Sequence, residues 1–94
     1  MRTNVTFHHL KSSPELRDAA LDTTNDFEKF SDDITSTDVI FKNDHDKTVE
    51  YTVRVSGNTL FASESSEDFH KSMNIAADKI VRQLKKWKTK RQKN

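Results

Sequence analysis

The alternation of apolar and polar residues at the start of the chain predicts a β-strand over residues 2–8. Thr3, Val5 and Phe7 would lie on one side of it, and the residues between them on the other. A period of two with β-branched and aromatic residues is typical of a half-buried strand. Three later segments carry strand patterns as well: residues 35–42, 49–55 and 59–63.

Two short polar segments predict turns between these later strands. Residues 43–46 read Asn-Asp-His-Asp, and residues 56–58 read Ser-Gly-Asn. Gly57 can adopt the positive φ that a tight hairpin turn needs. The last three strands are therefore expected to follow one another in antiparallel fashion.

A first helix is predicted to begin after Ser13. Serine suits the N-cap, Pro14 the first helical position, and Glu15 the positive end of the helix dipole. Apolar residues then recur at helical spacing, namely Leu16, Ala20, Phe27 and Phe30. The polar segment 31–33 is expected to end this helix.

A second, longer helix is predicted over about residues 66–91. The segment 65–68, Ser-Ser-Glu-Asp, offers capping and acidic residues for its first turn. An apolar stripe follows in steps of three and four: Phe69, Met73, Ala76, Ile80, Leu84 and Trp87. On a wheel of about 100° per residue the opposite side carries cations: Lys71, Lys79, Arg82, Lys85 and Lys86. Residues 89–94 are expected to fray.

The order β-α-β-β-β-α predicts an α+β fold in one domain, residues 1–94. The expected architecture is a four-stranded, mostly antiparallel sheet with two helices packed on one face, as in double-stranded RNA-binding domains. We expect three aromatic residues in the core between the layers: Phe61, Phe69 and Trp87.

Composition narrows the possible functions. Apolar residues make up 32% of 94 positions, which fills one modest core and leaves little to wall a deep substrate pocket. Without cysteine the chain has no disulfide framework and no thiolate metal site. With one glycine it has no glycine-rich phosphate loop. The longest aliphatic or aromatic run is three residues, so we expect no membrane span, no secretion signal and a cytoplasmic protein.

Charge is distributed unevenly along the chain. Residues 1–78 hold all fifteen acids and eight Lys or Arg, a net charge of −7. Residues 79–94 hold the other eight Lys or Arg and no acid, a net charge of +8. This asymmetry indicates a polyanion-binding end, with nucleic acid as the leading candidate.

Catalytic and metal-binding chemistry find little support in the sequence. His8 and His9 would point to opposite faces of a strand, and His45 lies in a turn between two aspartates. A nucleophile, a base and an orienting group would have to converge in a cleft, for which the chain is too small and polar. We therefore expect no enzyme activity, no cofactor, no metal and no small-molecule substrate.

Several motifs give the chain a resemblance to a known family. These are Asn4-Val5-Thr6, Pro14-Glu15-Leu16-Arg17, Phe27-Glu28-Lys29, Glu67-Asp68-Phe69 and Asp78-Lys79-Ile80-Val81-Arg82-Gln83-Leu84. The chain resembles, over nearly its whole length, the ribosome hibernation promoting factor family. That family includes the ribosome-associated inhibitor and the σ54 modulation proteins.

The resemblance implies a function. Members bind the small ribosomal subunit and its ribosomal RNA in the channel between head and body, where they overlap the mRNA and tRNA sites. They silence translation in starvation or stationary phase. The chain stops after the basic helix and so resembles the short form, expected to be monomeric off the ribosome. Two modes remain open, namely pairing ribosomes together with a separate ribosome modulation factor, or locking single ribosomes.

The resemblance and the charge pattern together suggest the residues that bind ribosomal RNA. On the last helix these are Lys79, Arg82, Lys85, Lys86, Lys88 and Lys90. Arg17, Lys29 and Lys42 match the family pattern elsewhere. Thr23 and Asp26 stand near positions where the family usually carries lysine, so the first helix is expected to contribute little.

Two other functions remain as alternatives. A stand-alone double-stranded RNA-binding module has the same architecture and would bind naked RNA duplexes as well as ribosomes. A small protein-interaction adaptor would instead use the acidic part of the chain.

Overall fold

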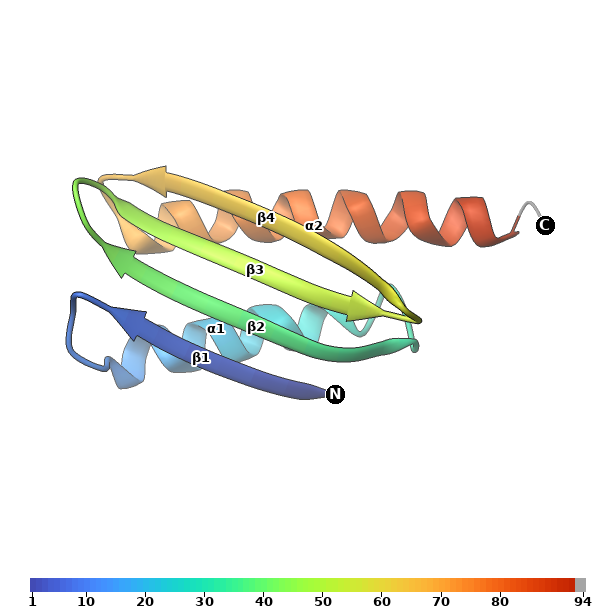
Figure 1. Ribbon diagram of the computed structural model, residues 1–94, viewed down its shortest axis with the longest axis horizontal. Helices are drawn as coiled ribbons and strands as arrows, with labels where there is room; N and C mark the ends of the chain where they lie inside the picture. Colours follow the sequence, from blue (N-terminus) through green and yellow to red (C-terminus); the bar gives the residue numbers. More distant parts are fainter. Residues whose placement is uncertain (93–94) are drawn as a thin grey trace.

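Four strands form one mixed sheet, and both helices cover the same face of it (Figure 1). The structure is a computed structural model that describes the backbone of residues 1–92 and the side chains of residues 1–88. The elements are β1 (Arg2–His8), α1 (Pro14–Phe27), β2 (Ile34–Asn43), β3 (Lys47–Val55), β4 (Asn58–Ser66) and α2 (Phe69–Gln92). The predicted order and α+β class are confirmed.

The sheet has the strand order β1-β2-β3-β4. β1 pairs in parallel with β2, with Arg2 opposite Ser36, because α1 carries the chain back between them. β2, β3 and β4 form antiparallel hairpins. At the β3–β4 turn, Ser56 has φ 45° and Gly57 has φ 82°, so the positive φ expected at Gly57 is present.

The core lies between the sheet and the helix layer. Alternate residues of β2 and β3 point toward the helices and are fully buried: Val39, Phe41, Val49, Tyr51, Val53 and Val55. From the helices, Phe27 meets Tyr51 edge to face at 5.4 Å between ring centroids, and Phe69 meets Phe41 at 5.6 Å. Ile80 and Leu84 of the apolar stripe are also fully buried.

α1 begins as predicted and ends earlier than predicted. Ser13 Oγ accepts a hydrogen bond from the Leu16 amide at 3.2 Å. The regular helix stops at Phe27, and the next three amides bond three residues back, as in a tightened last turn. Phe30 therefore packs against the core from a turn and not from the helix.

The thin part of the α1 apolar stripe is filled by a threonine. Thr24 is fully buried. Its hydroxyl donates to the Leu21 carbonyl at 3.0 Å, so the polar group is paired and the methyl group is left to pack.

The predicted start of the second helix is wrong by three residues. Ser65 and Ser66 belong to β4, where Thr48 and Ser65 share a hydrogen bond of 2.6 Å across the strands. The two serines therefore pair with β3 and do not cap the helix. Asp68 caps α2 instead, because its carboxylate accepts from the Lys71 amide at 3.1 Å.

The predicted fraying of residues 89–94 is not seen at residues 89–92, which continue the helix. Lysine, arginine and glutamine are good helix formers, so the helix continues past the apolar stripe, which ends at Trp87. The rest of that prediction falls on residues 93–94, which lie outside the described part.

The prediction that Phe61 lies in the core is wrong. Phe61 is 53% exposed, because the strand alternation turns its neighbours Leu60 and Ala62 toward the helices. Phe61 lies on the sheet face that the helices leave uncovered, which we call the open face. Phe69 is buried and Trp87 is half-buried against the core, as expected.

Candidate nucleic-acid interface

Three cations form a ridge on the outer side of α2. Lys79, Arg82 and Lys86 are exposed and spaced three and four residues apart, which places them on one side of the helix within about two turns. We call these three residues the basic ridge. The ridge runs beside β4, since Lys79 pairs with Glu64 on that strand and Lys86 lines a hollow with residues 58–60.

Two members of the basic ridge are paired within the molecule. Lys79 Nζ binds Glu64, and Arg82 Nη2 lies 3.3 Å from an Asp78 carboxylate oxygen one turn earlier. The Lys79 and Arg82 side chains remain 51% and 74% exposed. Exposed ion pairs such as Arg82–Asp78 contribute about 0–1 kcal/mol, so a phosphate can replace the Asp78 carboxylate at small cost.

The other flank of α2 carries further predicted cations. Lys85 Nζ lies 5.5 Å from the centre of the Phe30 ring. Lys88 and Lys29 line the same hollow of about 230 Å³ at the end of α1, and Lys29 also pairs with Asp26 at 3.1 Å. The structure therefore brings Lys29 to the same end of the helix layer as the α2 cations.

Two predicted residues lie apart from this group. Lys42 is on the open face, where its Nζ is 3.0 Å from Glu50. The Arg17 guanidinium lies over the Phe7 ring at 5.9 Å, on the β1 side of α1. The side chain of Lys90 lies outside the described residues.

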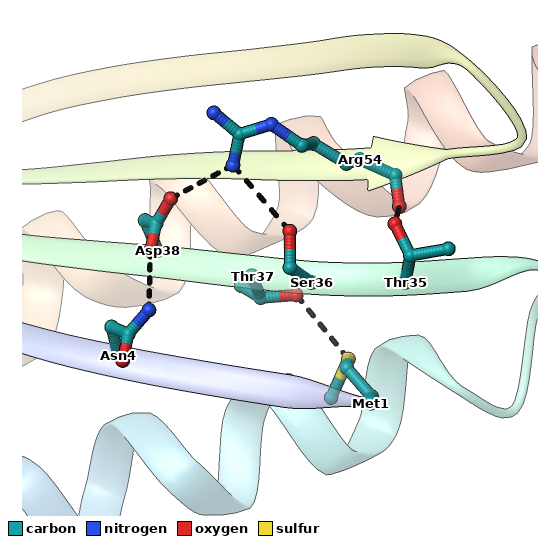
Figure 2. A network of polar contacts seen from close by, with 7 residues as sticks. All are labelled: Met1, Asn4, Thr35, Ser36, Thr37, Asp38 and Arg54. Carbon is teal, nitrogen blue, oxygen red and sulfur yellow. Dashed lines mark hydrogen bonds and ion pairs between the residues drawn. The ribbon is translucent and has the colours of Figure 1, made fainter.

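Four charged side chains of the open face form two ion pairs with one another. Figure 2 shows Asp38 at the centre of a polar network across β1, β2 and β3. Asp38 accepts from Asn4 Nδ2 at 3.1 Å and from Arg54 Nη1 at 3.1 Å, and the same Arg54 nitrogen reaches Ser36 Oγ at 3.4 Å. With Lys42 paired to Glu50, this face has little charge left for a polyanion.

Glu64 is a functional neighbour that the sequence reasoning missed. Strand alternation places Glu64 on the same side of β4 as Ala62, toward α2. The alternation of β4 could therefore have predicted that Glu64 faces this helix. Gln83 also reaches this strand, since its Nε2 donates to the Phe61 carbonyl at 2.9 Å. These contacts fix the rotation of α2 and turn the basic ridge outward.

The side chains of the basic ridge are of the types that bind phosphate. Lysine ammonium and arginine guanidinium groups neutralise phosphates, and arginine can bind them with two hydrogen bonds. Within residues 1–88, no group of three or more His, Asp or Glu side chains is arranged to hold a metal ion. His9 instead pairs with Asp44 at 2.5 Å, and His70 with Glu15 at 2.9 Å. No helix of the described part is long and apolar enough to cross a membrane.

Comparison with known proteins gives consistent matches along nearly the whole chain. A sequence model of the family described as "Sigma 54 modulation protein / S30EA ribosomal protein" matches residues 3–92. The ribosome hibernation promoting factor of Pseudomonas putida is 34% identical over 93 residues, which cover 98% of this chain and 91% of that protein. The protein of the same name from Azotobacter vinelandii is 35% identical over 91 residues, 96% of this chain and 85% of that one.

A solved structure shows the same fold. A ribosomal subunit interface protein from Coxiella burnetii superimposes with a TM-score of 0.84 at 26% sequence identity. The match covers 95% of this chain and 99% of that one. The order and packing of all six elements are therefore those of a protein whose name refers to the ribosome.

Proposed function

The chain belongs to the Sigma 54 modulation protein / S30EA ribosomal protein family, and from this membership we propose that it is a ribosome hibernation factor. It binds the small ribosomal subunit at the mRNA and tRNA channel and silences translation in starvation or stationary phase. It works in the cytoplasm. The relatives that share its fold and length are named for ribosome hibernation and for the ribosomal subunit interface.

The basic ridge is the observation that carries the proposal. α2 holds eight Lys or Arg and one acid, whereas on the open face Lys42 pairs with Glu50 and Arg54 pairs with Asp38. Ribosomal RNA is a dense array of phosphates, and contacts to phosphate set affinity and position with little reading of sequence. The ridge would therefore hold the protein against ribosomal RNA.

Silencing follows from occupancy. A rigid domain bound in the channel excludes mRNA and tRNA for as long as it stays there, and no catalytic step is needed. Inhibition should accordingly require about one protein per ribosome. Release would come from competition for the same phosphates or from a rise in ionic strength.

Charge reversal of the basic ridge tests the proposal. The variant Lys79→Glu, Arg82→Glu, Lys86→Glu should lose ribosome binding, because three attractions to phosphate become three repulsions. Its fold should persist, since the three side chains are exposed and surface substitutions usually change stability by about 0.5 kcal/mol or less each; a further cost is expected at position 79, where glutamate would face Glu64. Co-sedimentation with purified small subunits measures binding, and thermal unfolding measures the fold.

Two controls accompany this variant. Arg2→Glu, Lys11→Glu, Lys71→Glu makes the same change in net charge at other exposed positions and should keep most of the binding. Ile80→Ala should cost about 2–5 kcal/mol through the cavity it leaves, which shows what binding loss through unfolding looks like. If the ridge variant still sediments with the subunit, the basic ridge is not the binding surface.

A double-stranded RNA-binding module is the second candidate, because the architecture of a sheet backed by two helices with cations on one helix would also suit it. The two functions differ in their preference for ribosomes. A hibernation factor should bind small subunits far more tightly than a naked RNA duplex of equal length. Equal affinities would favour the RNA-binding module.

A further inference from the structure

The helix layer contains a groove that the basic ridge does not use. It lies between α1 and α2 and encloses about 420 Å³. Its lining comes from both helices: Thr23, Asp26, Phe27, Asn74, Ile75, Ala77, Asp78 and Val81. We call it the interhelical groove. The Glu15–His70 pair joins the two helices toward their N-terminal ends, and Lys85 lies over Phe30 toward the other end.

The middle of the interhelical groove is apolar. Phe27 and Ala77 are buried, and half-buried Val81 lies beside them. Ile75 is 38% exposed, one of few large hydrophobic side chains so exposed in the described part of the chain. An aliphatic or aromatic group seated here would remove Ile75 from water, at about 25 cal/mol for each Å² buried.

An unpaired polar group lies beneath this apolar surface. Tyr51 points from β3 into the helix layer, touches Phe27 and is fully buried. Its hydroxyl has no hydrogen-bond partner within the described residues. The neighbouring Thr23 side chain, which lines the groove, donates its own hydrogen to the Ala19 carbonyl at 2.9 Å. A buried hydroxyl without a partner costs about 1–3 kcal/mol.

Carboxylates surround the groove. Asp26 lies on the α1 wall and Asp78 on the α2 wall, and Asp22 precedes Asp26 by one turn. Asp26 and Asp78 have only exposed partners within their own chain segments, Lys29 at 3.1 Å and Arg82 at 3.3 Å. These pairs are weak and exchangeable. The carboxylates repel phosphate, so the groove selects against RNA although the basic ridge lies on the next face of α2.

We propose that the interhelical groove docks a lysine- and arginine-rich protein segment in extended conformation. The aliphatic stems of such side chains would cover Ile75 and Val81, and their charged ends would reach Asp22, Asp26 and Asp78. On the proposed function, this segment belongs to a ribosomal protein beside the RNA that the basic ridge binds. One helix layer would then recognise RNA and protein through adjacent surfaces of opposite charge.

The dimensions suit a short segment. The groove lining on α2 runs from Asn74 to Val81, a rise of about 11 Å at 1.5 Å per residue. An extended chain advances about 3.3 Å per residue, so about three residues fit. Alternation along such a segment would place one or two side chains into the groove and the others toward solvent.

The sign of a charge substitution distinguishes protein from RNA in the groove. The variant Asp26→Lys should weaken binding to purified small subunits by about tenfold or more, since like charges then face the docked cations. If RNA lies in the groove, the same variant binds more tightly. The control Asp18→Lys makes the same change in charge at an α1 position outside the groove lining and should bind at least as well as the unaltered chain.

Cross-linking identifies the occupant directly. A photoreactive benzoylphenylalanine at Ile75 should form an adduct with a basic segment of a ribosomal protein in the complex with purified small subunits. An adduct with ribosomal RNA, or no adduct while the protein still co-sediments, would overturn the inference and leave the proposed function standing. Loss of co-sedimentation by the unaltered chain would instead overturn the proposed function itself.

Discussion

Tyr51 shows how one side chain sets the conditions under which this fold is stable. It fills the centre of the core from β3, against Phe27, with its hydroxyl unpaired. Burial raises the pKa of the Tyr51 phenol well above its usual range. The folded state therefore holds the neutral phenol, whereas the unfolded chain ionises near pH 10.

The consequence is a loss of stability in alkali. The contribution of Tyr51 is complete below about pH 10 and falls as the pH rises above that value, because only the unfolded state then releases the proton. The slope approaches about 1.4 kcal/mol per pH unit for one group. Tyr51→Phe should remove this part of the pH dependence while changing stability at pH 7 by about 1 kcal/mol or less. Denaturant unfolding of both chains between pH 7 and 12 measures it, and identical pH profiles would refute the argument.

At the scale of elements, α2 combines a structural face with a binding face. Its buried stripe contacts β3 and β4, and Glu64 and Gln83 fix which side faces solvent. The helix depends on its first turn, since Asp68 holds the Lys71 amide at 3.1 Å and the Asp68 carbonyl begins the helical hydrogen bonds.

Removing this cap should destabilise the domain. Asp68→Ala should cost about 0.5–2 kcal/mol of unfolding free energy, because the Lys71 amide loses its acceptor. Asp68→Asn keeps an acceptor oxygen and should recover most of the loss. Chemical denaturation of the three chains compares them, and equal losses in both variants would mean that charge, not capping, is what Asp68 supplies.

The helices and strands were predictable where the residue pattern fits only one kind of secondary structure. The stripe from Phe69 to Trp87 and the alternation of β3 each allow one structure. Ser65 and Ser66 suit a helix cap and a strand equally, and only Thr48 on the neighbouring strand decides between them. Leu60, Phe61 and Ala62 are three apolar residues in a row, so the pattern did not show which of them face the helices. The interhelical groove could not be predicted, because it depends on the distance at which two helices settle on the sheet.

At the scale of the molecule, charge is sorted by face and by helix. α1 holds four acids and one arginine, α2 is strongly basic, and the open face pairs its ions internally (Figure 2). The net charge of +1 therefore conceals a strong dipole. Such a molecule is oriented by the field of a polyanion before it makes contact.

Ribosome binding should accordingly depend steeply on salt. If the basic ridge and its neighbours engage about four to six phosphates, the logarithm of the binding constant should fall with the logarithm of salt concentration at a slope of about −3 to −5. Titrations with small subunits between 50 and about 300 mM salt give the slope. A slope near zero would indicate that protein contacts alone hold the complex.

The parallel pairing of β1 has a consequence for the order in which the chain acquires its structure. β2, β3 and β4 meet through short hairpins, whereas each β1 residue pairs with one 34 positions later. Closing that long loop costs entropy before any contact repays it. β1 also contacts few elements besides β2. We expect β1 to join last in refolding and to open first in the native state. The β1 amides that are hydrogen-bonded to β2 should therefore exchange with deuterium faster than the amides of β3. Equal protection of the two strands would mean that the sheet opens only as a whole.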